Sequence, residues 1–310
     1  MGHTASALDQ KQNANIAAVD FAMDGVVLEK VAICEFSTYR WSFFEDVIRY
    51  STLGFDSIGI WRQKLDDFGI EAAIDVLLET NMKVSSLHWA GGFTGDGQTM
   101  DEAVSDASDA IQDACRLEAD CLIIHPGSRN HHTFKNTHKL LRLAMNRVIP
   151  IAQDYGVKLV VEPFFHSSGS RMTFINHLDE VAEILDQYSP HDLGLVLDLY
   201  HAGFDSEVFE ALPDLIDRID LVQVADRRLA EFECQPLKAD QSHRIVMGSG
   251  DISLTRWIQS LQELGYRGRY EVELHGTPVV SMDYFELLED VRTFFSCPEI
   301  QSALAVKSIA

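Results

Sequence analysis

The sequence predicts a single (β/α)8 TIM barrel with a short N-terminal extension, and three observations support this prediction. Short apolar runs alternate with amphipathic segments of helix length over most of the 310 residues. The apolar runs are rich in Val, Ile and Leu throughout, which is typical of parallel strands buried on both faces. The chain also has no G-x-G-x-x-G or P-loop sequence of the kind that would favour a doubly wound sheet.

The alternation yields eight strands and eight helices in strict order, as expected for a barrel. We expect strands at Lys30–Phe36, Ser57–Ile60, Lys83–His88, Cys121–His125, Lys158–Glu162, Gly194–Asp198, Leu221–Ala225 and Tyr270–Leu274. We expect helices at Trp41–Leu53, Ile70–Asn81, Asp101–Leu117, His138–Tyr155, Leu178–Tyr188, Glu207–Arg218, Leu254–Leu264 and Asp283–Phe295. Gly54, Gly156 and Gly265 each directly follow one of these helices, and glycine commonly ends a helix.

The chain contains no linker or low-complexity segment that would divide it into several domains. We therefore expect an N-terminal extension at residues 1–28, the barrel at 29–300 and a C-terminal tail at 301–310. No stretch approaches the apolar length of a membrane span, and the N-terminus lacks the apolar core of a signal peptide. The five cysteines are widely spaced without a C-x-x-C motif, which favours reduced thiols in a cytoplasmic protein.

Charge restricts the partners of this protein. The chain has 25 Lys and Arg against 48 Asp and Glu, a net charge of −23. Nucleic acids and anionic membranes are bound through basic side chains, so we expect neither as a partner. A small-molecule substrate and a homo-oligomer, either a dimer or a tetramer, are the remaining expectations.

Polar residues end the apolar runs from the third predicted strand to the eighth. They are His88, His125, Glu162, Asp198 with His201, Gln223 with Asp226, and Glu273. In a barrel of this type, the active site is built from the C-terminal ends of the strands, so these side chains are expected to meet at one mouth. Glu271 and Glu273 share one face of the last strand, and spacing alone allows either to point inward. Glu273 is favoured because it lies nearer the C-terminal end.

Converging carboxylates in such apolar surroundings would repel one another unless a cation lies between them. Glu162, Asp198, Glu273 and the amide oxygen of Gln223 form an oxygen-rich ligand set that suits Mg²⁺ or Mn²⁺. A single carboxylate at a strand end is more often a helix cap or an ion-pair partner. Four such residues in order on the last four strands favour joint ligation of one divalent ion.

Several neighbouring residues have two plausible roles. His88 and His125 either line the site or are core histidines with satisfied hydrogen bonds. The aromatic residues after the site residues either wall a sugar pocket or plug the barrel mouth, and we favour the pocket. They are Trp89, Phe93, Phe164 and Phe165. No basic phosphate pocket is evident, because Arg62, Lys64 and Arg129 are equally plausible as surface residues.

A set of short motifs resembles the xylose-isomerase-like barrel superfamily, especially its sugar isomerase and epimerase branch. The motifs are VVEP, DLYH, VQVAD-R, M-G-S-G-D-I and G-Y-x-G-x-Y-E-V-E-L, and the resemblance spans Val31 to His275. This branch includes hydroxypyruvate isomerases and ketose 3-epimerases. Many epimerases of the family have histidine where this chain has Gln223, whereas the hydroxypyruvate isomerase-like group has glutamine there.

The resemblance implies one divalent ion, Mn, Mg, Co or Zn, held by Glu162, Asp198, Gln223 and Glu273. It further implies that Glu162 and Glu273 are the acid and base of an isomerase or epimerase. The substrate would be a small sugar, keto-sugar or hydroxy-keto acid that reacts through a metal-bound cis-enediolate. His201, Arg227 and Arg228 are candidates for contacting substrate oxygens, together with His88, His125, Trp89 and Phe164. The stretch Leu229–Gly250 is long enough for a lid.

Three other functions share this fold. A dehydratase or lyase acting on a keto-inositol, dehydroshikimate or a 3-keto-glycoside begins with the same proton abstraction, so the ligand set cannot separate it. An apurinic endonuclease is disfavoured because Gln223 replaces a histidine, because Gln241-Ser242-His243-Arg244 lacks the family's D-x-H pair, and because of the net charge. A non-catalytic sugar-binding barrel is disfavoured because Glu162 and Glu273 are both present.

Overall fold

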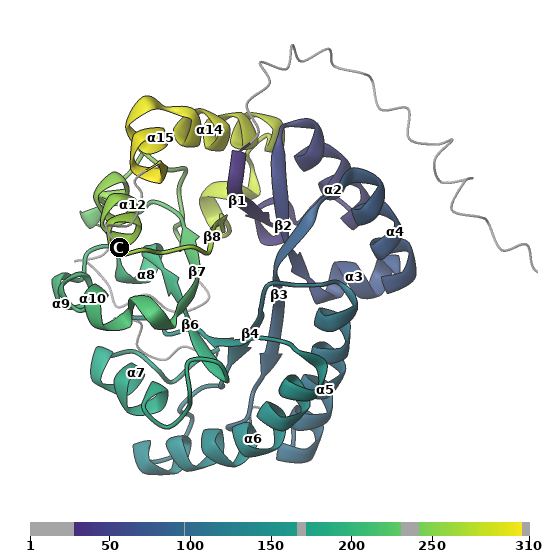
Figure 1. Ribbon diagram of the computed structural model, residues 1–310, viewed down its shortest axis with the longest axis vertical. Helices are drawn as coiled ribbons and strands as arrows, with labels where there is room; N and C mark the ends of the chain where they lie inside the picture. Colours follow the sequence, from purple (N-terminus) through teal and green to yellow (C-terminus); the bar gives the residue numbers. More distant parts are fainter. Residues whose placement is uncertain (1–27, 96, 166–171, 231–241, 306–310) are drawn as a thin grey trace, which may run out of the picture.

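The computed structural model describes residues 28–95, 97–165, 172–230 and 242–305. Within these ranges, eight parallel strands form a closed barrel, and their order around it follows the sequence (Figure 1). They are β1 (Leu28–Cys34), β2 (Phe55–Trp61), β3 (Lys83–Gly91), β4 (Leu122–His125), β5 (Leu159–Val161), β6 (Leu193–Asp198), β7 (Ile219–Val224) and β8 (Arg269–Val272). The predicted barrel is therefore confirmed. Residues 1–27 of the expected extension and 306–310 of the expected tail lie outside the described residues.

The ends of the observed strands differ from the predicted ends in ways that affect the site. β5 ends at Val161 and β8 at Val272, so Glu162 and Glu273 follow their strands. β3 continues past His88 to Gly91. The candidate residues consequently lie in or just beyond the C-terminal halves of the strands, on the face of the barrel where active sites are built.

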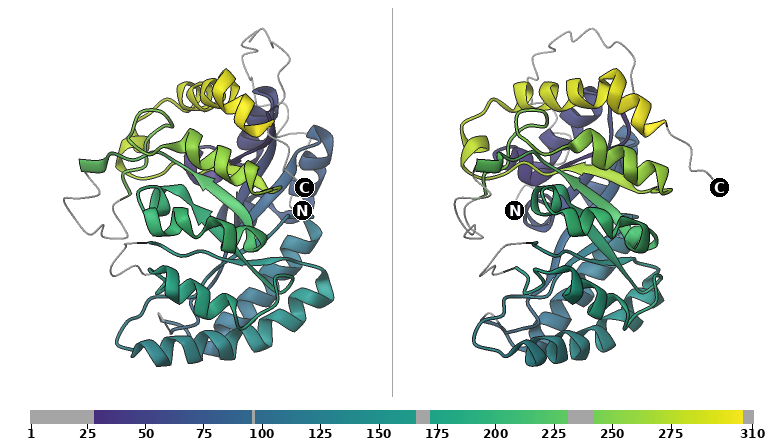
Figure 2. Two further views of the ribbon diagram at one scale, coloured as in Figure 1. Left: turned by 60° about the vertical axis from the view of Figure 1, so that its left-hand side comes forward. Right: turned by 90° about the vertical axis from the view of Figure 1, so that its left-hand side faces the viewer.

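Helices cover the outside of the barrel (Figures 1 and 2). The longer ones are α2 (Phe43–Thr52), α4 (Ile70–Thr80), α5 (Met100–Arg116), α6 (Phe134–Tyr155), α7 (Leu178–Leu185), α12 (Leu254–Glu263) and α14 (Tyr284–Ser296). Shorter helices are α3 (Arg62–Phe68), α8 (Leu199–Ala202), α9 (Ser206–Glu210), α10 (Leu212–Leu215), α13 (Thr277–Val280) and α15 (Pro298–Leu304), with 3-10 turns η1 (Glu35–Thr38) and η2 (Ile216–Arg218). The expectation of one helix between successive strands is wrong in detail, because short helices also occupy the loops.

The predicted helix Glu207–Arg218 is wrong as a single element, since the segment forms α9, α10 and η2. The Asp205 carboxylate accepts the N–H groups of Glu207 and Val208 and so starts α9. Pro213 lies in the first turn of α10. Proline has no N–H for a preceding helical turn, and its ring clashes with that turn, so a continuous helix ends before it.

Local sequence signals determine where other helices begin and end. Ser42 and Glu45 form a capping box at the start of α2, and Thr99 and Glu102 form another at the start of α5. In each box, the hydroxyl and the carboxylate satisfy backbone N–H groups that have no partner within the helix. α6 ends at Gly156, whose φ of 69° is in the left-handed region that glycine adopts without strain.

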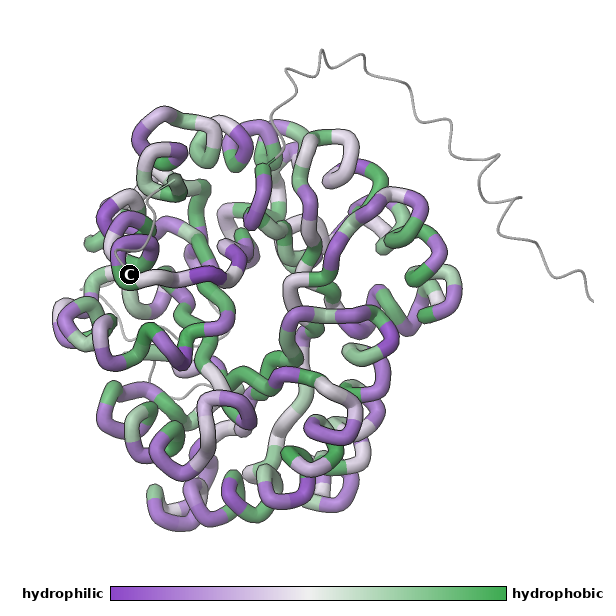
Figure 3. The backbone as a smooth tube through the Cα atoms, in the orientation of Figure 1, coloured by the Kyte–Doolittle hydropathy of each residue, from purple (hydrophilic) through white to green (hydrophobic). Residues whose placement is uncertain are grey.

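The hydrophobic core has two parts. Most buried apolar side chains pack between the strands and the helices in one cluster, and Figure 3 shows hydrophobic and hydrophilic residues alternating along the helices, as expected when one face is buried. A separate small cluster lies away from this layer and contacts Trp89. It consists of Cys121, Ile123, Val160, Val196 and Leu221. These residues alternate with the helix-facing ones along β4 to β7, so they fill the barrel interior beneath the mouth.

Two further findings concern membranes and thiols. Among the helices of the described ranges, none is both long and apolar enough to span a bilayer. The four cysteines within those ranges are free thiols, and they are Cys34, Cys115, Cys121 and Cys297.

Candidate active site

The four predicted metal ligands lie buried at the C-terminal ends of the last four strands. Glu162, Asp198, Gln223 and Glu273 expose between 0 and 6% of their surface. Asp198 is the last residue of β6 and pairs with Gln223 of β7, which pairs in turn with Glu271 of β8. The strand register therefore brings Asp198 and Gln223 to the same level of the barrel as Glu271, and Glu273 lies two residues further along the chain.

Three carboxylates and one guanidinium form the centre of the site, here named the mouth cluster: Glu162, Asp198, Glu273 and Arg244. The Arg244 guanidinium donates to Asp198 Oδ2 at 2.6 Å and lies 3.9 Å from Glu273 Oε1. On the other side, Glu162, Asp198 and His201 each offer a ligand atom, all within 4.8 Å of one another. The predicted ligand Gln223 is nearby, but its Nε2 faces Glu271.

Arg244 was missed by the sequence interpretation, which treated its segment only as a departure from a zinc-binding pattern. The chain brings it to the mouth through a two-residue antiparallel bridge between Asp226 and Ile245. The neighbouring bridge between His243 and Gly276 joins the same segment to the loop after β8. The only sequence signal was a basic residue shortly before a glycine-rich turn.

Asp226 is a structural anchor. Its carboxylate accepts the backbone N–H groups of Arg227, Gly248, Gly250 and Ile252 at 2.8 to 3.1 Å. A Cβ at Gly250 would lie 2.3 Å from Asp226 Oδ1, so only glycine fits there. The G-S-G motif thus wraps around a carboxylate of the same chain. Residues 231–241 of the predicted lid lie outside the described residues.

Glu271 of β8 and Glu273 just after it both point into the barrel, and Glu271 lies deeper than Glu273. Its Oε2 accepts the hydroxyls of Ser85 at 2.6 Å and Ser86 at 2.5 Å. Its Oε1 lies 2.8 Å from His88 Nε2 and 3.4 Å from Gln223 Nε2. The register between β2 and β3 shifts at Ser85, so two consecutive serines reach one carboxylate.

The surroundings of Glu162 and Glu273 move their pKa values in opposite directions. Burial and the charges of Glu273 and Asp198 raise the pKa of Glu162 well above its ordinary value. Burial alone would also raise the pKa of Glu273, but Arg244 and the hydrogen-bonded His275 hold it well below its ordinary value. Two carboxyl groups with separated pKa values are an arrangement suited to acid–base work.

Neutral and aromatic rings line one side of the mouth. His125 Nε2 lies 3.4 Å from Glu162 Oε2, and burial with the charge of His88 lowers the pKa of His125 to about 3. Burial and Arg244 lower the pKa of His201 well below its ordinary value. Phe164 stacks on His201 with ring centres 4.3 Å apart, and Trp89 meets His125 edge-on.

The other candidates have different surroundings. Phe93 and Phe165 are buried within the main core, so the expectation that they wall the mouth is wrong. Arg227 is buried with its guanidinium over the Tyr200 ring, whereas Arg228 is exposed. Arg62 is paired with Asp106, and Lys64 with Asp46, so both serve ion pairs of the scaffold. Arg129 is exposed and donates to the carbonyl of His132.

The residues of the mouth fit a divalent cation. The buried Gln223 Oε1 accepts no hydrogen bond from any described residue, and leaving such an oxygen unsatisfied is costly. Among the described residues, Arg244 bonds directly to Asp198 and lies 3.9 Å from Glu273, so the three carboxyl groups outnumber the guanidinium beside them. An orphaned amide oxygen beside unbalanced carboxylates is the donor set that oxygen-ligated divalent cations prefer.

The fold and this site define a class of proteins, and comparison with known families agrees. Residues 48–291 match the family model described as the xylose isomerase-like TIM barrel. The chain therefore belongs to this family, as its motifs indicated.

The relatives include isomerases and epimerases. A ketose 3-epimerase of Arthrobacter globiformis is 22% identical over 270 residues, which cover 82% of this chain and 87% of that protein. An inosose isomerase of Halalkalibacterium halodurans is 28% identical over 128 residues, covering 40% of this chain. The chain spans 54% of an uncharacterized protein of Methanocaldococcus jannaschii, at 25% identity, and 42% of the inosose isomerase.

A solved structure shares the fold closely. The crystal structure of the IolI protein with a bound zinc atom superposes with a TM-score of 0.75, covering 89% of this chain and 100% of that chain. Its sequence identity of 18% makes this a likeness of fold.

Proposed function

We propose that this protein is a divalent-metal-dependent isomerase or epimerase of a small carbohydrate, with Glu162 and Glu273 as its acid and base. The observation that carries the proposal is the buried convergence of Glu162, Asp198 and Glu273 beside the orphaned amide oxygen of Gln223. An inosose isomerase and a ketose 3-epimerase among the relatives support the same class of reaction.

The metal would be held by Glu162, Asp198, Gln223 and Glu273, with His201 beside them. When bound, a divalent cation supplies Lewis-acid polarisation of a substrate carbonyl and its neighbouring hydroxyl. Mn, Mg, Co and Zn all accept such oxygen donors. The choice among these four metals is set by availability as well as by ligand type.

The two glutamates move the proton. Glu273 lies 3.2 Å from His275 Nε2 and 3.9 Å from Arg244, and its carboxylate would accept the proton from the substrate carbon. Glu162 is buried in the same mouth, with His125 Nε2 3.4 Å from its Oε2, and would be the second carboxyl group that returns a proton. Return to the adjacent carbon gives isomerisation, and return to the opposite face of the same carbon gives epimerisation.

The remaining residues bind the substrate and exclude water. His125 Nε2 faces Glu162, whereas its Nδ1 has no hydrogen-bond partner among the described residues, so the ring offers that nitrogen to a sugar hydroxyl. His201 lies beside Asp198, next to where a sugar oxygen would bind. Phe164 and Trp89 supply apolar walls, and Arg227 holds a distal oxygen. A carbohydrate substrate, a cytoplasmic location and a dimeric or tetrameric assembly complete the proposal.

The test combines metal analysis with proton exchange. Wild type and Asp198→Asn are compared for metal content per chain, and ketoses, hydroxypyruvate and keto-inositols are screened by NMR for exchange of a C–H with deuterated solvent. We expect exchange only in the metal-loaded wild type. We expect Glu162→Gln and Glu273→Gln each to reduce it by about 10²- to 10⁴-fold.

Glu180→Gln is the matched control, because Glu180 is a buried carboxylate that caps α7 away from the mouth. Its exchange rate is expected to stay at the wild-type level. Product analysis separates isomerisation from elimination, which begins with the same proton abstraction. A protein that neither contains nor takes up a divalent metal would refute the proposal.

A further inference from the structure

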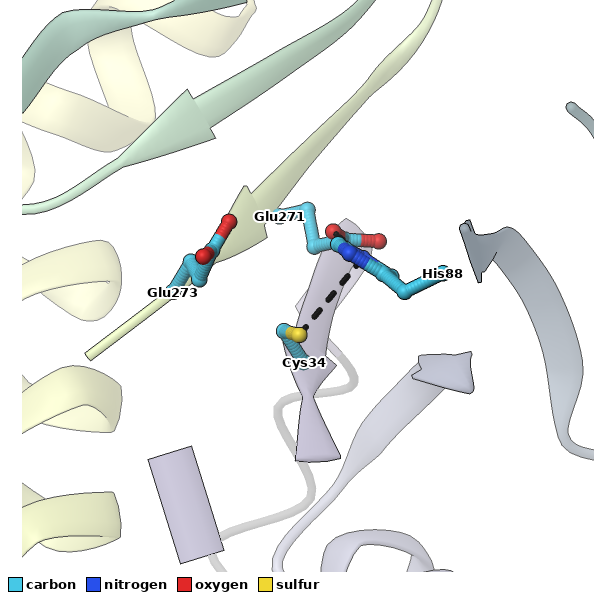
Figure 4. A group of neighbouring side chains, drawn as sticks. All are labelled: Cys34, His88, Glu271 and Glu273. Carbon is cyan, nitrogen blue, oxygen red and sulfur yellow. Dashed lines mark hydrogen bonds and ion pairs between the residues drawn. The ribbon is translucent and has the colours of Figure 1, made fainter. Parts of the chain in front are cut away.

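Next to the mouth cluster lies a second group of side chains of different chemical character. Cys34 ends β1, His88 lies in β3, Glu271 lies in β8 and Glu273 follows it, and these four residues are here named the Cys34 cluster. All four are buried, and each offers one ligand atom within 4.8 Å of the others. Figure 4 shows Cys34 and His88 pointing toward Glu271, with Glu273 to one side.

His88 Nε2 has two competing hydrogen-bond partners. Its Nε2 lies 2.8 Å from Glu271 Oε1 and 3.5 Å from Cys34 Sγ. One ring nitrogen carries either a single hydrogen or a single lone pair, so it cannot serve both partners fully. A cation at the point where the three atoms converge would accept an electron pair from each.

Glu271 is held in the orientation that a ligand requires. The hydroxyls of Ser85 and Ser86 occupy its Oε2, and its Oε1 faces His88. A Cβ at Gly59 would lie 2.4 Å from Glu271 Oε2, so β2 provides room for the carboxylate by having glycine there. Such outer hydrogen bonds, which fix one oxygen and direct the other, are typical of carboxylates that bind metals.

The sulfur–nitrogen distance and the atom types suit a small cation with soft character, and Glu271 Oε1 would move away from His88 Nε2 by about 0.5 Å to share it. Four-coordinate Zn²⁺ bonds sulfur at about 2.3 Å and nitrogen at about 2.0 Å, which in a tetrahedron puts these two atoms about 3.5 Å apart. The Cys34 Sγ to His88 Nε2 distance is 3.5 Å. A thiolate with an imidazole and carboxylates selects Zn²⁺, Co²⁺ or Fe²⁺ over Mg²⁺.

We propose that Cys34, His88, Glu271 and Glu273 form a second divalent-cation site of thiolate, imidazole and carboxylate ligands. Glu273 would be shared with the mouth cluster, one carboxylate serving both sites. Binding deprotonates the Cys34 thiol and releases its proton to solvent, with the sulfur forming the bond to the cation; nothing is oxidised or reduced. The inference goes beyond the proposed reaction, because it requires only that the cluster bind a cation.

Cobalt provides a direct test. Metal-free full-length protein is titrated with Co²⁺ while its absorption is recorded in the near ultraviolet, where thiolate-to-cobalt charge transfer appears. We expect two equivalents of Co²⁺ per wild-type chain, with the charge-transfer band saturating at one equivalent. Cys34→Ser should lose the band and one equivalent. Asp198→Asn should lose one equivalent and keep the band, so failure of the mouth site and failure of the second site are distinguishable.

Cys121→Ser is the matched control, because Cys121 is equally buried in the barrel interior but donates to the Ser85 carbonyl at 3.4 Å. It should keep both equivalents and the band. Circular dichroism checks that each variant is folded, and Cys34→Ala replaces Cys34→Ser if the serine variant does not fold. The proposal is overturned if saturated wild type shows no charge-transfer band, or if the band survives in Cys34→Ala or Cys34→Ser.

Discussion

Two of the buried charged clusters among the described residues differ in how completely their partners satisfy them. The first is the mouth cluster. The second, here named the α2–α3 network, joins η1, α2 and α3 and consists of Glu35, Thr38, Asp46, Tyr50 and Lys64. Both are nearly inaccessible to solvent. Their difference separates buried charges that stabilise the fold from buried charges that are retained for another purpose.

The α2–α3 network is the more nearly closed of the two, although Glu35 Oε1 accepts no hydrogen bond from a described residue. Lys64 pairs with Asp46, lies 3.8 Å from Glu35 Oε1 and donates to the Thr38 carbonyl at 3.1 Å. Asp46 also accepts the Thr38 hydroxyl, and Glu35 Oε2 accepts the N–H of Trp61 at 2.8 Å. Its members lie within 30 residues of sequence, from Glu35 to Lys64. Both acids lie within 4 Å of the Lys64 ammonium, so two carboxyl groups share one cation.

The mouth cluster is open. Its carboxylates come from separate strands, Arg244 bonds directly to only one of them, and Gln223 Oε1 has no partner among the described residues. Such an arrangement costs folding free energy. The larger excess of acids, drawn from separate strands, therefore distinguishes this candidate site from a structural ion pair, since each cluster has one orphaned oxygen in it or beside it.

The largest expected effect comes from breaking the α2–α3 network. Lys64→Met leaves Asp46 and Glu35 as buried acids without a cation, and we expect a loss of about 3 to 5 kcal/mol in the free energy of unfolding. Urea denaturation measures it. The matched control is Lys83→Met, because the Lys83 side chain is 59% exposed and lies 3.6 Å from Asp56. The control is expected to change stability by at most about 1 kcal/mol. If both variants lost the same free energy of unfolding, burial of the ion pair would not explain its contribution to stability.

At the mouth, removing a charged group is expected to raise the free energy of unfolding instead of lowering it. Glu162→Gln removes one of several crowded carboxylates, so the metal-free variant is expected to be more stable than metal-free wild type by about 1 kcal/mol or more at neutral pH. The matched control Glu180→Gln should lose about 1 kcal/mol, because Glu180 accepts the N–H groups of Asn176 and His177 at the start of α7.

The pH dependence of this difference follows from the raised pKa of Glu162. A carboxyl group whose folded pKa is raised contributes full stability below its ordinary pKa and loses it as pH rises through the raised value. The advantage of Glu162→Gln should therefore be absent below the ordinary carboxyl pKa and grow toward neutral pH. Thermal unfolding of both metal-free proteins across this range measures it. A difference that is constant with pH would contradict the ionisation argument.

Much of the fold and of the candidate site could be predicted from the sequence, because both depend on patterns that repeat along the chain. The eight apolar runs define the barrel, and the same runs locate Glu162, Asp198, Gln223 and Glu273, since residues at strand ends meet at one mouth whatever the loops do. The helix at Glu207–Arg218 was wrong because Pro213 and the Asp205 cap outweigh an amphipathic pattern.

Arg244 and Cys34 could not be identified from the sequence, for a different reason. Arg244 reaches the mouth through a bridge to Asp226 that is set by loop geometry and has no periodic signal. Cys34 ends the first strand as an ordinary apolar residue would, and only closure of the barrel between β1 and β8 brings it near Glu271. Contacts that depend on closure and loop conformation are not encoded in spacing along the chain.

The smallest effect on stability is expected at Gln223. Gln223→Met removes an orphaned oxygen and only a long, 3.4 Å hydrogen bond to Glu271, so the metal-free chain should change by less than about 1 kcal/mol. Gln262→Met is the matched control. It removes the amide that donates to the Tyr270 hydroxyl and the Tyr266 carbonyl, so it should lower the free energy of unfolding by about 1 to 2 kcal/mol. Mn²⁺ affinity, measured by competition titration, should fall at least about tenfold in Gln223→Met and stay unchanged in Gln262→Met. If Gln223→Met binds Mn²⁺ as tightly as wild type, the Gln223 amide oxygen is not a ligand. The carboxylates of the mouth cluster would then hold the cation without it.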